Sequence, residues 1–284
     1  MLGAFSRGER FGRRSATATV LAVRSISARY AGSVCGMQLI QSLKDWLTRW
    51  IRKTGLVPRI AHATGCAAPL FRASGPAPGY HSQIAQDHFL DRRVFLGRTG
   101  GVFVDVGAHD GVKFNNTLFF EADRGWTGVC IEPQPDVFLR LRESRSALCV
   151  QAAIGDTPGT MPFVVGEGKA ETFSGLAASY GARNRTRVKK FGQTKTIDVE
   201  VRRLDEVLRA SKIDRVDLLS IDVEGGELGV INSIDLAEYG WPIVVMENNY
   251  RSWPQVRAMR RQGYQLLCRI EFDEVFIPVE TRLA

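Results

Sequence analysis

Several features that define other classes of protein are missing from this chain. Its five cysteines are odd in number, widely spaced and include no C-x-x-C pair, so the sequence suggests neither a disulfide framework nor a thiolate zinc site. No apolar run approaches the roughly 18 residues of a membrane-spanning helix, and no G-x-G-x-x-G string is present. This composition fits a reducing compartment best, and we expect a cytoplasmic protein.

Acidic residues are almost absent from the N-terminal segment. Residues 1–60 carry 11 Lys and Arg against Glu9 and Asp45 alone, a local balance of +9. The whole chain has 38 basic and 30 acidic residues and a net charge of +8, so residues 61–284 keep 27 basic and 28 acidic residues, or −1. A basic protein raises the question of a nucleic-acid partner. Because the charge belongs to an appendage, we predict no nucleic-acid partner.

Residues 1–79 are predicted to form a basic tail, an amphipathic helix at about 38–53 and a linker rich in Gly, Pro, Ala and Ser. The composition of residues 1–36 fits a mitochondrial transit segment, an unstructured tail or a misassigned start ahead of Met37, and these alternatives stay open. The helix is apolar on one face and basic on the other, so it either packs on the following domain or makes a peripheral membrane contact.

The rest of the chain, residues 80–284, reads as one α/β domain. Short β-branched runs alternate with amphipathic stretches, which predicts a seven-stranded, mostly parallel sheet with helices on both faces. Only residues 271–273 separate the last two runs, which predicts a C-terminal antiparallel hairpin. Residues 157–201 break the rhythm and are interpreted as an insertion. The predicted strands are Val102–Val106, Gly128–Glu132, Leu148–Ile154, Val216–Asp222, Ile243–Glu247, Tyr264–Ile270 and Glu274–Val279; the predicted helices are Asn115–Arg124, Pro135–Ser144, Leu204–Ser211, Gly226–Leu236 and Trp253–Gln262.

The first predicted strand runs into a glycine-bearing turn, where open α/β sheets bind ligands. Asp105, Gly107, Ala108 and Gly111 of this turn are candidate cofactor contacts. Gly107 suits a tight turn, and Gly111 suits a close approach of the backbone to a ligand. Asp105 and Asp110 would repel a phosphate and suit a cation. A plain structural turn is the alternative.

Glu132 ends the second strand, 27 residues after Asp105. Nucleotide-binding α/β folds place there the acid that accepts both hydroxyls of an adenosine ribose, although a solvated strand-end acid is the alternative. S-adenosylmethionine bears a sulfonium and an ammonium group and no phosphate, so the acidic turn favours it over NAD. Asp156, just past the third strand, is a candidate acceptor for the adenine amino group.

Asp222 and Glu224 follow the fourth strand and Glu247 ends the fifth, at the same sheet edge. Asp222 is expected to orient or deprotonate a hydroxyl nucleophile, and Glu224 and Glu247 are further candidate catalytic residues. The three carboxylates could hold a hard cation such as Mg²⁺, but strand-end carboxylates usually serve without one, so no metal is predicted. Glu227, in the next helix, is interpreted as a partner of the helix dipole.

These motifs resemble those of the FkbM-type methyltransferases, which depend on S-adenosylmethionine. The resemblance implies a Rossmann-like methyltransferase fold and O-methylation of a hydroxyl on a sugar, glycan or secondary metabolite. It implies cofactor contacts at Asp105, Gly107, Glu132 and Asp156, and active-site roles for Asp222 and Glu224. The sequence departs from the family at His109, where Asn is frequent. The similarity spans about residues 80–278 and is carried by Ser82–Gln83, Gln86–Asp87, Phe103–Ala108, Asn115–Thr117, Gly125–Gly128, Ile131–Pro133 and, most specifically, Ile221–Gly225.

Three other functions are alternatives. A nicotinamide-dependent oxidoreductase would require the G-x-G-x-x-G turn that is missing. A nucleic-acid methyltransferase would show an Asn/Asp-Pro-Pro-aromatic string or a Pro-Cys nucleophile, and neither occurs. A non-catalytic nucleoside-binding protein has no need for so many strand-end carboxylates. The basic insertion suits either a mobile lid for an anionic or glycosylated acceptor or a solvated loop. We expect a small-molecule or glycan acceptor, and the oligomeric state is left open.

Overall fold

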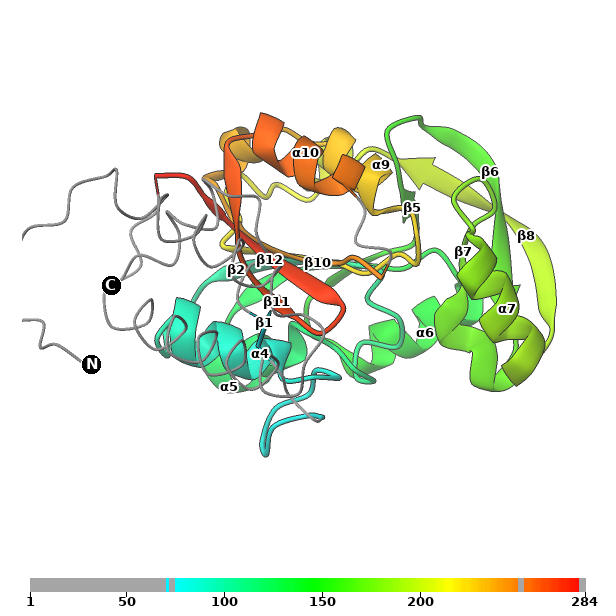
Figure 1. Cartoon of the computed structure of the whole chain (residues 1–284), viewed down its shortest axis with the longest axis horizontal. Helices are drawn as coiled ribbons and strands as arrows, with labels where there is room; N and C mark the ends of the chain where they lie inside the picture. Colours follow the sequence, from blue (N-terminus) through cyan, green and yellow to red (C-terminus); the bar gives the residue numbers. More distant parts are fainter. Residues whose placement is uncertain (1–69, 72–74, 250–252, 281–284) are drawn as a thin grey trace, which may run out of the picture. The chain divides into compact units, whose positions relative to one another are not determined.

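The structure is a computed structural model that describes residues 70–71, 75–249 and 253–280, and Figure 1 shows their arrangement. The predicted basic tail, the amphipathic helix at 38–53 and the alternative start at Met37 lie outside these residues. Among the helices that are described, none combines the length and the apolar character that crossing a bilayer requires.

A large sheet of eight strands positions the functional site. The strands run in the order β1-β11-β12-β10-β9-β2-β3-β4, and β12 is antiparallel to both of its neighbours, whereas the other pairs are parallel. The chain order reverses at β2, and a ligand crevice forms where it does so, at the carboxyl ends of the strands. The bounds are β1 (Leu70–Phe71), β2 (Val102–Val106), β3 (Thr127–Ile131), β4 (Leu148–Val150), β9 (Leu218–Ile221), β10 (Ile243–Glu247), β11 (Tyr264–Ile270) and β12 (Asp273–Pro278).

The predicted seven-stranded sheet and its C-terminal hairpin are confirmed, with two differences. β1 adds an eighth strand within the residues predicted as linker, where its backbone pairs with β11. The prediction of one continuous strand over Leu148–Ile154 is wrong. The chain leaves the large sheet after β4, and β5 (Ala153–Ile154) pairs instead with β8 (Thr194–Arg202) of a second sheet.

Helices cover both faces of the large sheet, and strand alternation decides which side chains meet them. Val104 and Val106 of β2 pack in the core formed with α8, α9 and α10, whereas Phe103 packs in the core formed with η1, α5 and α6. Asp105 shares the face of Phe103, because alternate residues of a strand point the same way. Figure 1 shows α9 and α10 on one side of the sheet and α4 and α5 on the other. The bounds are α4 (Gln86–Phe89), η1 (Leu90–Val94), α5 (Leu118–Arg124), α6 (Pro135–Ser144), α8 (Leu204–Ala210), α9 (Glu227–Asn232) and α10 (Trp253–Arg261).

The segment interpreted as an insertion builds most of a second, four-stranded sheet in the order β5-β8-β6-β7. β6 (Gly159–Gly166) pairs with β8 along its whole length, and the pair buries a small core around Phe163 and Val199. The segment η2 (Gly168–Phe173), the strand β7 (Gly175–Leu176) and the helix α7 (Ala182–Phe191) lie between β6 and β8 in the chain. Figure 1 shows this sheet and α7 beside the carboxyl edge of the large sheet.

Candidate functional site

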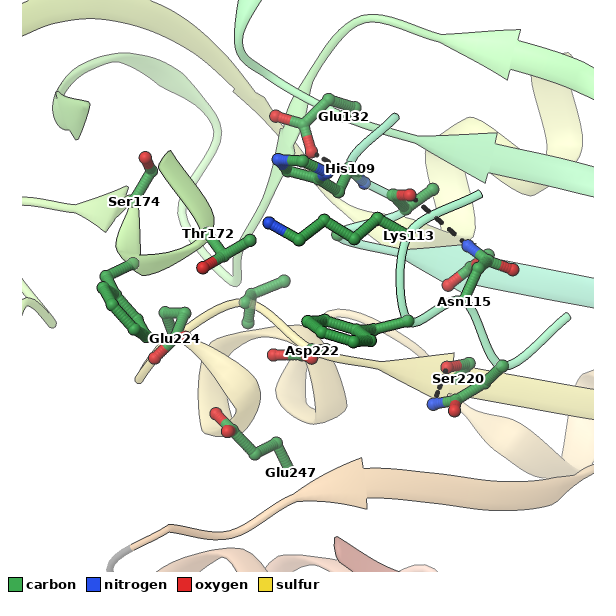
Figure 2. A pocket seen from close by; sticks show the side chains of 18 of the residues that line it. His109, Lys113, Asn115, Glu132, Thr172, Ser174, Ser220, Asp222, Glu224 and Glu247 are labelled. Atoms are coloured by element: carbon green, nitrogen blue, oxygen red, sulfur yellow. Dashed lines mark hydrogen bonds between the residues drawn. The ribbon is translucent and has the colours of Figure 1, made fainter. Parts of the chain in front are cut away.

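A pocket of about 350 Å³ lies at the carboxyl ends of β2, β3, β9 and β10, within the size range of small-molecule sites. Figure 2 shows side chains from several strand ends and from the insertion pointing into it. The pocket brings together residues that are far apart in the sequence. The predicted site residues that line it are Asp105, Gly107, Ala108, Glu132, Asp222, Glu224 and Glu247.

Gly107 joins the first turn to the end of β9. Its φ is +85°, a left-handed conformation that favours glycine. A Cβ atom at this position would lie 1.8 Å from the backbone oxygen of Asp222, and the amide of Asp222 donates to the oxygen of Val106 over 2.9 Å. Only a residue without a side chain therefore lets the turn lie directly against Asp222.

Asp105 is 3% exposed and is hydrogen-bonded to the loop that follows it. Its Oδ2 accepts from Asn115 Nδ2 and from Thr117 Oγ1, both at 2.8 Å. Asn115 Oδ1 accepts in turn from the amides of Thr117 and Leu118, which begins α5. Burial raises the pKa of Asp105, and the guanidinium of Arg145 opposes that rise. Asp105 thus holds the loop against the sheet at the wall of the pocket.

Glu132 is 4% exposed and stands at the end of β3. Its Oε2 accepts from the amide of His109 over 3.1 Å, and its Oε1 accepts from the amide of Gln134 over 2.9 Å. A carboxylate offers about four lone-pair sites, so acceptor capacity remains toward the pocket. Burial raises the pKa of Glu132 to about 7, although these backbone donors favour the charged form.

The amides of the first turn are already bonded within the protein. Gly107 and Ala108 donate to the oxygen of Ile131 over 3.0 and 3.1 Å, and His109 donates to Glu132. A pyrophosphate at such a turn is held by amides that point at it. The three amides are committed elsewhere, so the turn is poorly suited to bind a dinucleotide in that way.

His109 links the first turn to the insertion. Its φ is +52°, and its ring Nε2 lies 3.2 Å from Glu171 Oε2 on η2. Arg140 of α6 forms an ion pair with the same oxygen over 2.7 Å. The insertion is therefore fastened next to the Glu132 end of the pocket, with the imidazole between Glu132 and η2.

Asp222, Glu224 and Glu247 form a carboxylate trio at the other end of the pocket. One oxygen from each lies within 4.8 Å of the other two, and Figure 2 shows the three side chains around one space. Asp222 lines the pocket and is exposed there. Desolvation by the surrounding side chains, followed by the charges of Glu224 and Asp273, raises its pKa well above the usual value, and desolvation beside Asp222 raises that of Glu247. The trio can share a proton or hold a hard cation.

Contacts with the insertion position Glu224 in the trio. Its φ is +55°, and Asn184 of α7 donates to its backbone oxygen over 2.9 Å. Arg187, one turn further along α7, lies 4.0 Å from Glu224 Oε2. Glu227 stands apart: its Oε1 accepts from the amide of Gly225 and its Oε2 from Gln255, which fits the structural role predicted for it.

Two predicted cofactor contacts do not line the pocket. A Cβ at Gly111 would meet Arg145 Cγ at 2.6 Å and Leu141 at 2.7 Å, so its close backbone approach is to α6 and not to a ligand. Asp156 is exposed, and its Oδ1 lies 3.4 Å from Thr157 Oγ1. The chain has left the large sheet before Asp156, and Ala153 and Ile154 line the pocket in its place.

Several pocket residues were missed by sequence reasoning because their placement is tertiary. Gln86 donates to Asp273 Oδ2 and joins α4 to the hairpin. Phe114 and Phe272 line the pocket although they are 49% and 43% exposed. The motif strings that contain Gln83 and Gln86, and the basic insertion that contains Arg187, were the signals for these residues in the sequence. The missed residues are Gln83, Gln86, Lys113, Phe114, Glu171, Thr172, Phe173, Ser174, Arg187, Phe272 and Asp273.

Comparison with known proteins supplies the family. Residues 105–266 match the family model described as the methyltransferase FkbM domain. The chain is 30% identical over 191 residues to methyltransferase sdnD of Sordaria araneosa, which covers 58% of this chain and 70% of the relative. A crystal structure of the methyltransferase FkbM from Methylobacillus flagellatus aligns with 15% identity and a TM-score of 0.40 over 93% of this chain and 59% of that one. Because the family-model match spans more than half of the chain, the chain belongs to the FkbM methyltransferase family.

Proposed function

We propose that this chain is an S-adenosylmethionine-dependent methyltransferase that methylates a hydroxyl oxygen on a sugar, a glycan or a secondary metabolite. The observation that carries the proposal is a single pocket with two chemically different ends. Glu132 lies at one end with acceptor capacity toward the pocket, and the carboxylate trio lies at the other. The first end suits the diol of a ribose, and the second suits removal of a proton from a hydroxyl.

The residues of the first end fit S-adenosylmethionine better than a dinucleotide. Glu132 supplies the acid that a ribose requires, while the amides of Gly107, Ala108 and His109 are bonded within the protein. A cofactor without phosphate needs no free amides at this turn. S-adenosylmethionine, when bound, supplies a methyl group that its sulfonium makes electrophilic.

The carboxylate trio takes up the proton that the acceptor's hydroxyl group loses. Burial and mutual repulsion raise the pKa values of both Asp222 and Glu247, so this pair favours the uptake of a proton. An ionised carboxylate of raised pKa is a better base than an ordinary aspartate. We assign to Asp222 the acceptance of the hydroxyl proton and to Glu224 and Glu247 the hydrogen bonds that orient the acceptor.

The walls of the pocket support a ring-shaped, hydroxylated acceptor. Phe114 and Phe272 expose large apolar surfaces there, and such surfaces mark ligand grooves when they cluster. The trio can accept hydrogen bonds from hydroxyl groups, whereas its acidic character disfavours the phosphates of a nucleic acid. We therefore propose a small-molecule or glycan acceptor and no nucleic-acid partner.

The test is incubation with methyl-labelled S-adenosylmethionine and a panel of hydroxylated, glycosylated and nucleic-acid acceptors. We expect label in a hydroxylated or glycosylated acceptor, and no retention of tritiated NAD. Asp222→Asn should bind the cofactor but not transfer the label, and Asp198→Asn, a change at an exposed site on β8, should behave as the wild type. Label in nucleic acid, or retention of NAD in place of S-adenosylmethionine, would overturn the proposal.

We propose a cytoplasmic location from the composition of the chain. The mitochondrial alternative, the peripheral membrane contact and the start at Met37 concern residues 1–69, which lie outside the described residues. These stay predictions. A cofactor-binding assay on the chain beginning at Met37 would show whether residues 1–36 contribute to the site.

A further inference from the structure

Arg145 follows α6, and its side chain is completely buried. Nothing in the sequence singled it out. Its guanidinium faces the loop between β2 and α5 and the first half of α5. It donates to Glu121 Oε2 at 2.6 Å, Thr117 Oγ1 at 3.0 Å, Asn115 Oδ1 at 3.1 Å and the backbone oxygen of Gly111 at 3.2 Å, and it lies 4.0 Å from Asp105 Oδ2.

These hydrogen bonds engage all three nitrogens of the guanidinium and use four of its five N–H donors. A buried Arg stays charged, so it requires both anionic partners and hydrogen-bond acceptors around it. Here Glu121 and Asp105 supply the charge, while the loop supplies the remaining acceptors. Asn115 and Thr117 each contact both Arg145 and Asp105, so the four side chains form one connected network.

Gly111 shows independently that the loop is fitted to this arginine. It has a φ of +79°, and a Cβ there would lie 2.6 Å from Arg145 Cγ. Arg145 Nη1 donates to the oxygen of the same residue. The loop backbone therefore lies on the Arg145 side chain, which explains a glycine that the sequence suggested for ligand approach.

We propose that Arg145 is a positioning residue of the cofactor site, whose buried guanidinium docks the loop from Gly107 to Thr117 onto α6 and compensates the charge of Asp105. It touches no ligand in this role. The inference rests on the proposed function, because the loop it holds carries Gly107, Ala108 and the amide that binds Glu132.

The charge of Arg145 gives this role a signature that packing alone would not produce. Arg145 is the largest of the influences that hold down the pKa of Asp105 against its burial. The other titratable groups near Asp105 are the Cys130 thiol of β3, the Asp222 carboxyl after β9 and, across Arg145, Glu121 of α5. Without the arginine, Asp105 takes up a proton at a higher pH and can no longer accept both loop donors.

The experiment measures S-adenosylhomocysteine affinity by calorimetry from about pH 6 to about pH 9 for Arg145→Met and Arg145→Lys. We expect Arg145→Met to bind about tenfold more weakly than the wild type at the acidic end, with the deficit shrinking as pH rises. Arg145→Lys should show a smaller loss of affinity, because lysine keeps the positive charge and lacks only the planar guanidinium with its several N–H donors. In an Asp105→Asn background the deficit should no longer vary with pH. Arg142→Met is the matched control, because Arg142 is an exposed arginine in the last turn of α6.

A second readout needs no cofactor and separates this inference from the proposed function. Melting temperatures are compared for Arg145→Met, Asp105→Asn and the double variant, with Arg145→Lys in place of Arg145→Met if the latter is insoluble. We expect the double variant to lose less than the sum of the single losses, since each single change leaves the other partner's buried charge unbalanced. Failure of the wild type to bind either S-adenosylmethionine or S-adenosylhomocysteine would sink the proposed function. Additive melting losses, or an affinity deficit equal at every pH, would overturn the role of Arg145.

Discussion

The carboxylates at the two ends of the pocket have different surroundings. At the end proposed to bind the cofactor, here called the cofactor end, Asp105 and Glu132 are buried and accept hydrogen bonds from loop side chains and backbone amides. At the end proposed to bind the acceptor, here called the acceptor end, Asp222, Glu224 and Glu247 face one another within 4.8 Å. Hydrogen-bonded carboxylates hold their neighbours in place, whereas crowded carboxylates retain protons. This difference fits the proposed division of the pocket into an end that positions the cofactor and an end that takes up the acceptor's proton.

Gly107→Ala is expected to have the largest effect, because it breaks the contact between the two ends. The new Cβ would lie 1.8 Å from the Asp222 oxygen, and overpacking of this kind costs roughly 1–3 kcal/mol of unfolding free energy. Cofactor binding and methyl transfer should both be lost, as measured by calorimetry and by product formation. Gly97→Ala is the control, because Gly97 has a φ of +78° with nothing within 4 Å of its would-be Cβ. Equal effects of the two variants would show that backbone strain and not the contact matters.

Asp222→Asn should impair the function of the acceptor end and leave that of the cofactor end intact. We expect turnover to fall by about 10²–10⁴-fold, the usual contribution of a general base, with cofactor affinity nearly unchanged. Initial rates and calorimetry on the same preparation measure both quantities. A loss of cofactor affinity as large as the loss of turnover would contradict the division of the pocket.

Glu132→Gln should affect the cofactor end alone. The raised pKa of about 7 means that the wild-type carboxylate is lost as pH falls through 7, so S-adenosylmethionine affinity should decline below that pH. The amide variant should bind about tenfold more weakly at pH 8, where it has lost one charge-assisted acceptor, and should show a flatter pH profile. A wild-type affinity that is constant from about pH 6 to about pH 8 would argue against the carboxylate as the ribose acceptor.

Glu224→Gln should sharpen the account of the acceptor end through its pH profile. The charge of Glu224 is the strongest of the charges that raise the pKa of Asp222, so its removal should lower that pKa and leave more of the base ionised at acidic pH. The acidic limb of kcat should move down by about one pH unit, as seen in turnover measured across pH. An unmoved limb would mean that the two carboxyls do not share protons.

Phe272→Ala should have the smallest effect, confined to acceptor affinity. The side chain is 43% exposed and lines the pocket, so its loss should raise the acceptor KM by roughly 2–10-fold, the equivalent of about 0.5–1.5 kcal/mol for an aromatic contact. Cofactor affinity should not change. Leu96→Ala is the control, because Leu96 is 65% exposed and lies outside the pocket. A similar rise in KM for that variant would contradict a contact between Phe272 and the acceptor.

Much of this organisation was predictable from local sequence. The β-branched runs gave the strands of the large sheet, and the short Glu271–Asp273 connection required a hairpin. Because parallel strands end at one edge, the residues after them had to meet there, which is why Asp105, Glu132, Asp222 and Glu247 were found. The strand predicted over Leu148–Ile154 failed because periodicity reports an extended backbone and not the sheet to which it pairs.

The sequence by itself determined the class of sheet, the family and the carboxylates at its edge, because these follow from side-chain periodicity and from short motifs along the chain. Only the tertiary structure decided how each carboxylate behaves. Burial and crowding raise the pKa of Asp222, Arg145 compensates Asp105, and Gly111 serves that arginine and not a ligand. Charge compensation and desolvation depend on neighbours that are distant in sequence, so no local pattern can record them.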